Sequence, residues 1–206
     1  MIDSCQLASV IADKLVKSGL FEVEASARHV HLCQKDMEQL FGTGKTLTPV
    51  RDLSQKGEFL CKERVEIVTD RRTLKNVAVL GPLRPDSQVE LSLTDGVSLG
   101  MKLPVRDSGD VRDTPGILLR SEFGEVSLSS GCIAARRHIH VTPEDARVLG
   151  LNDKELIAIE VLGGRRTIYC DVLVRVKDSF RLRVHLDMDE ANAAGMDGFT
   201  LARLIR

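Results

Sequence analysis

The chain has 206 residues, of which 43% are apolar and only 3% aromatic, and its 29 basic residues nearly balance its 30 acidic ones. This length and apolar fraction allow one sizeable core or two small ones, built mostly from aliphatic side chains. The near-neutral charge leaves no electrostatic footprint for nucleic acid or an anionic membrane, and the scarcity of aromatic rings argues against base-stacking surfaces.

Five cysteines are widely scattered, at positions 5, 33, 61, 132 and 170, with no Cys-x-x-Cys pair and no secretory leader ahead of them. This pattern predicts reduced thiols in a cytoplasmic setting. No apolar run approaches the ~18–20 residues needed to span a bilayer, so we expect a soluble protein with no membrane partner.

Residues 3–17 show the pattern of a short amphipathic helix. Asp3 or Ser4 can cap its start and Gly19 can end it. Its apolar positions follow helical spacing: Leu7, Val10, Ile11 and Leu15. Two interpretations stay open for residues 1–18, namely a helix packed on its own domain and a peptide that docks on a partner.

Beyond this helix, short strands separated by turn signals predominate. Short helices closed by glycine are predicted at 35–41 and 143–149. Strands are predicted at 20–25, 63–68, 77–80, 88–92, 117–120, 125–128, 132–135, 156–161, 167–174 and 181–186. Many short strands and few helices indicate small β-barrels or sandwiches rather than a parallel α/β sheet.

An internal repeat organises the chain. The tetrad Arg-His-x-His occurs at 28–31 and again at 137–140, about 109 positions later, and each copy precedes one of the two short helices. We therefore expect a mainly β chain of two small β-barrel domains related by this repeat and capped by short helices. The first domain is placed at 28–131 and the second at 132–206, with 19–27 as a leading strand shared with the second barrel.

Each tetrad places two imidazoles on one face, because residues i and i+2 of a strand point the same way. The pairs are His29 with His31 and His138 with His140, and the chain has only one other histidine, His185. Strand histidines often only satisfy hydrogen bonds, but the duplication favours metal binding. Zinc is the first choice because imidazole-rich sites suit it.

A third protein ligand is expected for each pair, with an open position left for water or substrate. His185 lies on the polar face of its predicted strand and can complete one set. For the other set the residues leave four candidates open: Glu90, Glu63, Cys33 and Cys61.

Two further features could bind an oxyanion. Arg84 stands between Pro82 and Pro85, so a turn holds its guanidinium fork stiffly, although a plain surface charge is the alternative. The segment from Ser108 to Asp110 is either a tight turn or a loop whose hydroxyl and N–H groups contact phosphate oxygens.

Seven motifs in the expected order make the chain similar to the PduL-type phosphate propanoyltransferases over about residues 20–197. They are RHVHL at 28–32, LTPVRDLSQ at 47–55, VLGPLR at 79–84, QVELS at 88–92, VRDSGD at 105–110, RHIH at 137–140 and VHLDMDEANAAG at 184–195. The departures are small, with Ala27, Cys33 and Val141 standing where such sequences often have Asn, Ser and Met.

The resemblance implies two β-barrels that meet at a dinuclear zinc site, with two zinc ions per chain. One zinc would be held by His29, His31 and Glu90, and the other by His138, His140 and His185. Arg84 would contact the phosphate as the catalytic residue, with Gln88 and Ser108 beside it in the substrate-binding set.

The reaction implied by the family converts a short acyl-CoA, propanoyl-CoA or acetyl-CoA, and phosphate into acyl phosphate and free CoA. Direct attack by phosphate is the favoured route, and Cys33 or Cys61 as an acyl carrier stays open. A dinuclear zinc hydrolase of thioesters or phosphoesters is the rival activity, and a structural or buffering zinc module is the non-enzymatic alternative.

The resemblance also implies a location and partners. Relatives often carry an N-terminal peptide that takes them into a bacterial microcompartment, so residues 1–18 are expected to bind shell or core proteins of its lumen, with the cytoplasm as the alternative location. We expect a homo-oligomer, a dimer or larger, and no nucleic-acid partner.

Overall fold

The computed structural model describes residues 3–205, whose contacts divide into two compact units. The barrel unit consists of residues 3–26, 137–186 and 190–205. The sheet unit consists of residues 27–136 and 187–189. The second histidine tetrad begins at the boundary between the two, so each unit receives one His-x-His pair.

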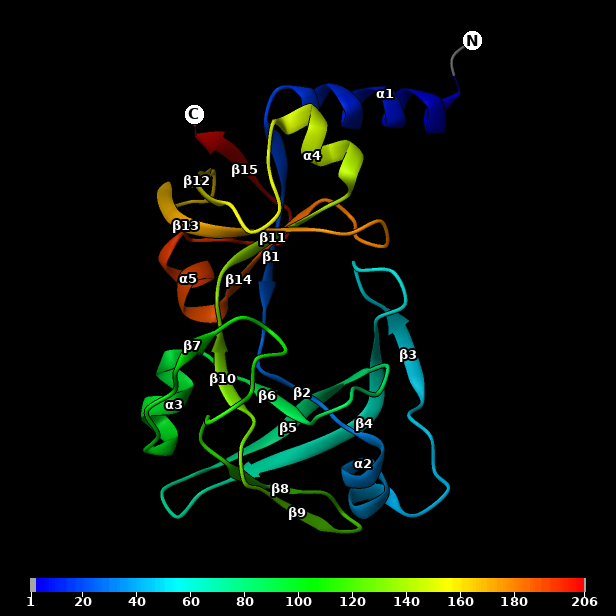
Figure 1. Cartoon of the computed structure of the whole chain (residues 1–206), viewed down its shortest axis with the longest axis vertical. Helices are drawn as coiled ribbons and strands as arrows, with labels where there is room; N and C mark the ends of the chain where they lie inside the picture. The colour runs from blue at the N-terminus through cyan, green and yellow to red at the C-terminus, as the bar shows by residue number, and fades with distance from the viewer. Residues whose placement is uncertain (1–2, 206) are drawn as a thin grey trace. The chain divides into compact units, whose positions relative to one another are not determined.

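A closed six-stranded barrel forms the centre of the barrel unit, with the strand order β1-β14-β11-β13-β12-β15 (Figure 1). Its strands are β1 (Leu20–Ser26), β11 (His138–Val141), β12 (Leu156–Val161), β13 (Thr167–Val176), β14 (Arg183–Asp187) and β15 (Thr200–Ile205). Its helices are α1 (Ser4–Lys17), α4 (Pro143–Leu149) and α5 (Met188–Ala193). Only β11 and β13 pair in parallel, and the other described pairs are antiparallel.

Alternation along the barrel strands decides which side chains reach its core. In β11, Ile139 and Val141 are fully buried among the aliphatic residues of the barrel, and in β14 the same holds for Val184. Each such burial contributes about 1.5–3 kcal/mol to folding. Because neighbours along a strand face opposite ways, the histidines of β11 and β14 lie on the outer wall of the barrel.

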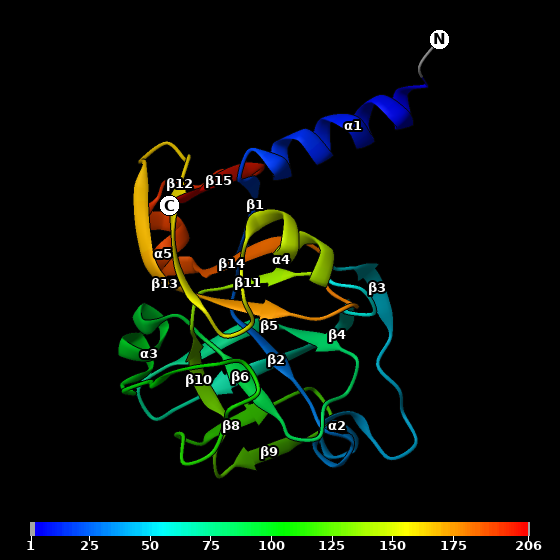
Figure 2. The same ribbon diagram turned by 45° about the horizontal axis from the view of Figure 1, so that its top comes forward.

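The first helix is confirmed, but little of it is buried. α1 contacts β1 and α4, beside which it lies in Figures 1 and 2, and Val16 packs partly against the barrel core. Three residues of its apolar stripe remain about half exposed: Leu7 at 49%, Val10 at 50% and Ile11 at 49%. The barrel therefore covers only the last turn of this helix.

A mixed nine-stranded sheet forms the sheet unit, with the order β7-β10-β6-β2-β5-β4-β8-β9 and β3 paired to β4 (Figure 1). Its strands are β2 (His29–His31), β3 (Pro49–Asp52), β4 (Phe59–Val68), β5 (Thr73–Gly81), β6 (Gln88–Glu90), β7 (Val105–Arg106), β8 (Ile117–Arg120), β9 (Glu125–Leu128) and β10 (Cys132–Ala135). Its helices are α2 (Gln34–Phe41) and α3 (Leu93–Leu99). β2 lies between β5, its parallel neighbour, and β6, its antiparallel neighbour.

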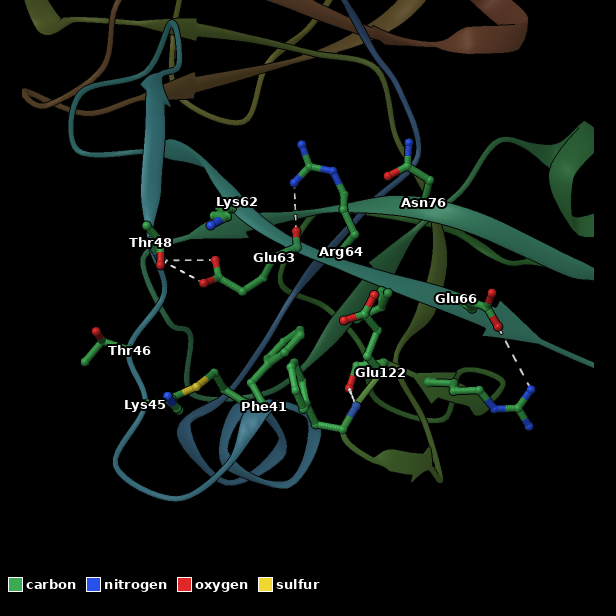
Figure 3. A pocket seen from close by; sticks show the side chains of 15 residues that line it. Phe41, Lys45, Thr46, Thr48, Lys62, Glu63, Arg64, Glu66, Asn76 and Glu122 are labelled. Carbon is green, nitrogen blue, oxygen red and sulfur yellow. Dashed lines mark hydrogen bonds and ion pairs between the residues drawn. The ribbon is translucent and has the colours of Figure 1, made fainter.

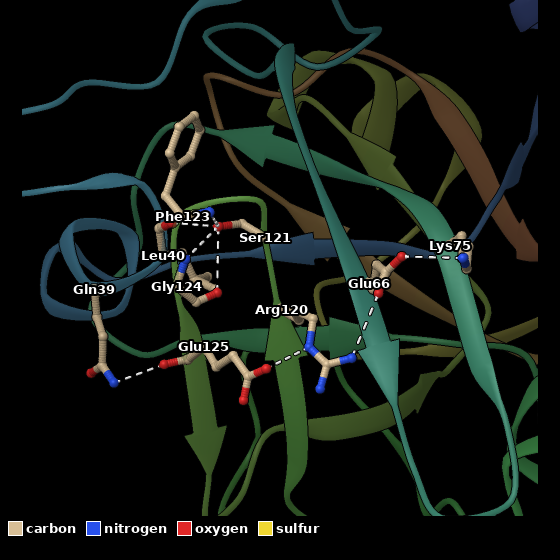
Figure 4. Close-up of polar contacts among 9 residues, drawn as sticks. All are labelled: Gln39, Leu40, Glu66, Lys75, Arg120, Ser121, Phe123, Gly124 and Glu125. Atoms are coloured by element: carbon tan, nitrogen blue, oxygen red, sulfur yellow. Dashed lines mark hydrogen bonds and ion pairs between the residues drawn. The ribbon is translucent and has the colours of Figure 1, made fainter.

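The turn between β8 and β9 fastens α2 to this sheet (Figure 4). Gln39 donates its side-chain amide to the Glu125 carbonyl at 2.8 Å, and the Ser121 hydroxyl donates to the Leu40 carbonyl. Gly124 is required here, because a Cβ atom at this position would lie 2.3 Å from the Gln39 carbonyl oxygen. The close approach fixes the helix that directly follows the first His-x-His pair.

The expected mainly β architecture is confirmed, with one closed barrel and one half-barrel sheet. Five described elements have no counterpart in the predicted ones: α3, α5, β3, β7 and β15. For α3 the reason is Gly96, a poor helix former that is nevertheless required because a Cβ there would lie 2.8 Å from Leu103. Among the described residues, no helix is long and apolar enough to cross a membrane.

Candidate metal-binding groups

The first group gathers on two antiparallel strands of the sheet unit. The register of β2 and β6 sets His29 opposite Glu90 and His31 opposite Gln88, while Val30 and Val89 between them are fully buried in the core. One ligand atom from each of His29, His31 and Glu90 lies within 4.8 Å of the others. The predicted pair on one face is therefore present, together with a carboxylate.

Burial and neighbouring charges shift the pKa values of the three residues in this group. Burial lowers the pKa of His29, but the Glu90 carboxylate, 3.6 Å from the His29 Nε2 atom, outweighs it and the net pKa lies above 6.5. Burial raises the pKa of Glu90, but His29 brings it well below 4.5. Burial and the charge of His29 hold the pKa of His31 well below its usual value, so its imidazole is neutral and can act as a metal ligand.

The second group lies on the outer wall of the barrel. The antiparallel register of β11 and β14 pairs His138 with His185, and His140 lies two residues further along β11. The three imidazoles offer ligand atoms within 4.8 Å of one another. Burial and then the nearby charges of His138 and His185 lower the pKa of His140 to about 2, which keeps it neutral.

Phe180 covers one imidazole of the second group. It lies between β13 and β14 and stacks on the ring of His140, with a centroid distance of 4.0 Å and an interplanar angle of 27°. The stacked ring restricts the orientation of His140. Nothing in the sequence pattern singles Phe180 out, because an isolated phenylalanine in a turn has no periodicity.

Both groups fit a metal ion. Among the described residues, the buried Nδ1 atoms of His31 and of His140 have no hydrogen-bond partner, although burying an unsatisfied ring nitrogen is costly. The donor sets, three imidazoles in one case and two imidazoles with a carboxylate in the other, suit zinc and leave a fourth tetrahedral position open. His29 also has the outer partner typical of a ligand, since its Nδ1 atom lies 2.8 Å from the Ala27 carbonyl oxygen.

A polar network joins the first group to Arg84. The Arg84 Nη1 atom donates to the Ser108 hydroxyl at 3.3 Å, and that hydroxyl donates to Glu90 Oε1 at 2.8 Å. Gln88 donates to both Ser108 and Glu90, and its carbonyl oxygen accepts the Gly109 N–H at 2.7 Å. The structure thus brings the three expected oxyanion-binding side chains together beside the first histidine pair.

The other candidate ligands lie elsewhere. Both carboxylate oxygens of Glu63 share the Thr48 N–H, and Cys61 is fully buried in the core with a pKa raised by burial to about 11. Cys33 caps the start of α2, where its N–H donates to the Ser87 hydroxyl at 3.0 Å. None of these three belongs to a metal-ligand group of the described residues.

Glu58 is a site residue that the sequence pattern does not reveal. Its Oε1 atom lies 3.7 Å from the Nη2 atom of Arg84, and both side chains are partly exposed, at 35% and 27%. The arginine fork therefore contacts Ser108 through one nitrogen and Glu58 through the other. In the sequence, Glu58 follows Gly57 and resembles an ordinary polar loop residue. Only the folded chain shows that it lies beside Arg84.

A cavity of about 1030 Å³ opens on another part of the sheet unit (Figure 3). It lies between α2, β4 and the β8–β9 turn, with Phe41, Arg64 and Phe123 among its lining residues. None of the histidines lines it. The Arg64 guanidinium donates to the backbone carbonyls of Cys61 and Glu63, and neither metal-ligand group of the described residues lies at this cavity.

Comparisons with known proteins agree on one family. A family model described as phosphate propanoyltransferase matches residues 22–197. A phosphate propanoyltransferase of Clostridioides difficile (strain 630) is 46% identical over 201 residues, covering 98% of this chain and 96% of the relative. Proteins of the same name are 50% identical over 181 residues in Listeria monocytogenes (88% and 84% covered) and 47% over 184 residues in Thermotoga maritima (89% and 88% covered). The segment that the family model matches contains both metal-ligand groups and Arg84.

Proposed function

The chain belongs to the phosphate propanoyltransferase family, and we propose that it transfers a propanoyl or acetyl group from CoA to phosphate with one zinc ion in each metal-ligand group. The observation that carries this proposal is the network from Glu90 through Ser108 to Arg84. It links a donor set for a metal directly to a guanidinium fork suited to phosphate.

The residues of the sheet unit bind and orient the nucleophile. Arg84 pairs with phosphate oxygens and holds the phosphate at the first group, while Ser108 and Gln88 fix the guanidinium and the Glu90 carboxylate. A phosphate oxygen attacks the thioester carbonyl carbon, the C–S bond breaks, and the products are acyl phosphate and the CoA thiolate. Bound zinc supplies Lewis acidity that polarises the carbonyl and stabilises the thiolate.

A covalent cysteine intermediate is not needed. The buried Cys61 thiol has its pKa raised to about 11 and Cys132, also buried, to about 12, so neither forms a thiolate nucleophile near neutral pH. Cys33 is half-buried and its backbone N–H is held by Ser87. The proposal therefore keeps phosphate as the direct attacking group.

The test is phosphate dependence of CoA release by the zinc-loaded protein. A transferase releases CoA from propanoyl-CoA only when phosphate is present and forms acyl phosphate in equal amount. Release of CoA and free propanoate without phosphate would instead identify the protein as a metal-dependent thioester hydrolase.

We also propose that residues 1–18 dock on shell or core proteins of a bacterial microcompartment, and that the chain works there as a homo-oligomer. The support is the half-exposed apolar stripe of α1, which the barrel unit leaves largely uncovered. A fluorescent reporter fused to residues 1–18 should co-purify with microcompartment shells. A reporter that stays in the bulk cytoplasm would remove the targeting proposal.

A further inference from the structure

Glu58 is held beside Arg84 by the pairing of β4 with β5. The register sets Phe59 opposite Gly81, and a Cβ atom at Gly81 would lie 2.3 Å from the Phe59 ring, so the two strand ends are in close contact. Glu58 directly precedes Phe59, and Arg84 follows Gly81 by three residues. The ion pair is therefore set by the register of the two strands.

The backbone on both sides of this pair is fixed. The Glu58 N–H donates to the Gln55 carbonyl at 3.2 Å, and the Glu58 carbonyl accepts the Leu53 N–H at 2.9 Å. The Arg84 N–H donates to the Leu32 carbonyl at 2.9 Å. Because both backbones are held by hydrogen bonds, only motion of the side chains can separate the Glu58 carboxylate from the Arg84 guanidinium.

The Glu58 carboxylate lies beside the Nη2 atom of the Arg84 guanidinium, whereas Ser108 accepts from the Nη1 atom. A carboxylate and a phosphate present similar oxygen pairs to guanidinium, so both compete for the same donors. An ion pair this exposed is weak, which means that an incoming dianion can displace it. Glu58 also adds a negative charge at the place where phosphate arrives, and this repels the substrate.

We propose that Glu58 is an internal competitor for phosphate at Arg84, and that it sets the phosphate concentration at which the enzyme works. This inference rests on the proposed function for the role of Arg84. Glu58 swings aside when phosphate binds and returns when acyl phosphate leaves. It acts through Arg84 and is a positioning residue with no part in bond making.

The experiment compares Glu58→Gln with the parent chain, both loaded with zinc, in CoA release from propanoyl-CoA at varied phosphate. Glutamine keeps the size of the side chain and removes its charge. The KM for phosphate should fall by about twofold to fivefold, with kcat within about twofold and the KM for propanoyl-CoA unchanged. An unchanged KM for phosphate overturns the proposal. A raised KM overturns it as well, because it means that Glu58 helps to hold Arg84 in place.

Glu125→Gln is the matched control. It removes a carboxylate that pairs with Arg120 on the exposed surface of the same unit, outside the Arg84 network. Its KM for phosphate should equal that of the parent. An equal fall in both variants would show that net charge alone is responsible and would refute a specific role for Glu58.

Thermal unfolding in the presence of inorganic phosphate separates this inference from the proposed function. Phosphate should raise the melting temperature of Glu58→Gln at lower concentrations than it raises that of the parent, whatever reaction the protein catalyses. If the parent shows no phosphate-dependent turnover, the proposed function fails on its own. If both chains respond to phosphate alike, the competition by Glu58 is excluded.

Discussion

Replacing Arg84 with lysine isolates the contribution of the guanidinium fork from that of its charge. In the structure the Nη1 atom of Arg84 lies 3.3 Å from the Ser108 hydroxyl, while the Nη2 atom points to Glu58 at 3.7 Å. A lysine ammonium is a single point charge and reaches only one of these directions. The variant therefore keeps the positive charge but loses the two-pronged contact to phosphate.

The size of the effect follows from the lost contact. One hydrogen bond to a charged group is worth about 1.5–3 kcal/mol, which corresponds to a loss of about tenfold to 150-fold in kcat/KM for phosphate. Arg84 lowers the pKa values of His29 and His31 through its charge, and lysine retains that charge. Zinc content should therefore stay at the parent value.

The assay is CoA release from propanoyl-CoA at varied phosphate, together with metal analysis of the same preparation. A variant whose kcat/KM lies within about twofold of the parent would refute the fork as the phosphate ligand. A variant that loses zinc would also contradict the reasoning, because the defect would then lie in the metal group.

Three further predictions concern the metals, the thiols and the first helix. Replacing His138 with alanine should lower zinc content by about one ion per chain and abolish turnover, because the two remaining ligands hold the ion poorly. Full zinc content and activity in this variant would show that the second group is not a metal site. Cys170 is exposed and should react with iodoacetamide at pH 8. Cys61 has a pKa of about 11, so only about 0.1% of it is thiolate at pH 8, and it should react only above about pH 10 or on unfolding. Fast labelling of Cys61 at pH 8 would disprove its burial. Deleting residues 1–13, which spares Val16, should leave zinc content and the melting temperature nearly unchanged. A melting temperature lowered by more than about 5 °C would show that the deleted part of the helix stabilises the barrel unit.

Local pattern was enough to predict most strands and both histidine pairs. Where apolar and polar residues alternate, as in Glu125–Leu128, the predicted and observed bounds coincide. They also coincide for Cys132–Ala135, a short and entirely apolar run. The repeat predicted two imidazoles on one face, and His29 with His31 and His138 with His140 have this arrangement. Period-two patterning and repetition are properties of the sequence itself, so they can be recognised before folding.

Contacts between distant segments could not be predicted from pattern. Glu58 meets Arg84 only because β4 pairs with β5, and Phe180 meets His140 only because the turn after β13 folds over β11. From the residues alone, Glu90 was one of four candidate ligands, and its register with His29 distinguishes it from Cys61 and Glu63. The hydrophobic pattern shows which face of a strand is buried, but which distant strands pair is decided only in the folded chain.

Acyl phosphate formation is the measurement that tests the central claim most directly. The zinc-loaded protein is incubated with propanoyl-CoA with and without inorganic phosphate, and acyl phosphate is trapped with hydroxylamine while free CoA is counted in parallel. The account predicts equal amounts of acyl phosphate and CoA, both absent without phosphate and both lost after removal of zinc by a chelator. Release of CoA without phosphate, or turnover that survives the loss of zinc, would contradict it.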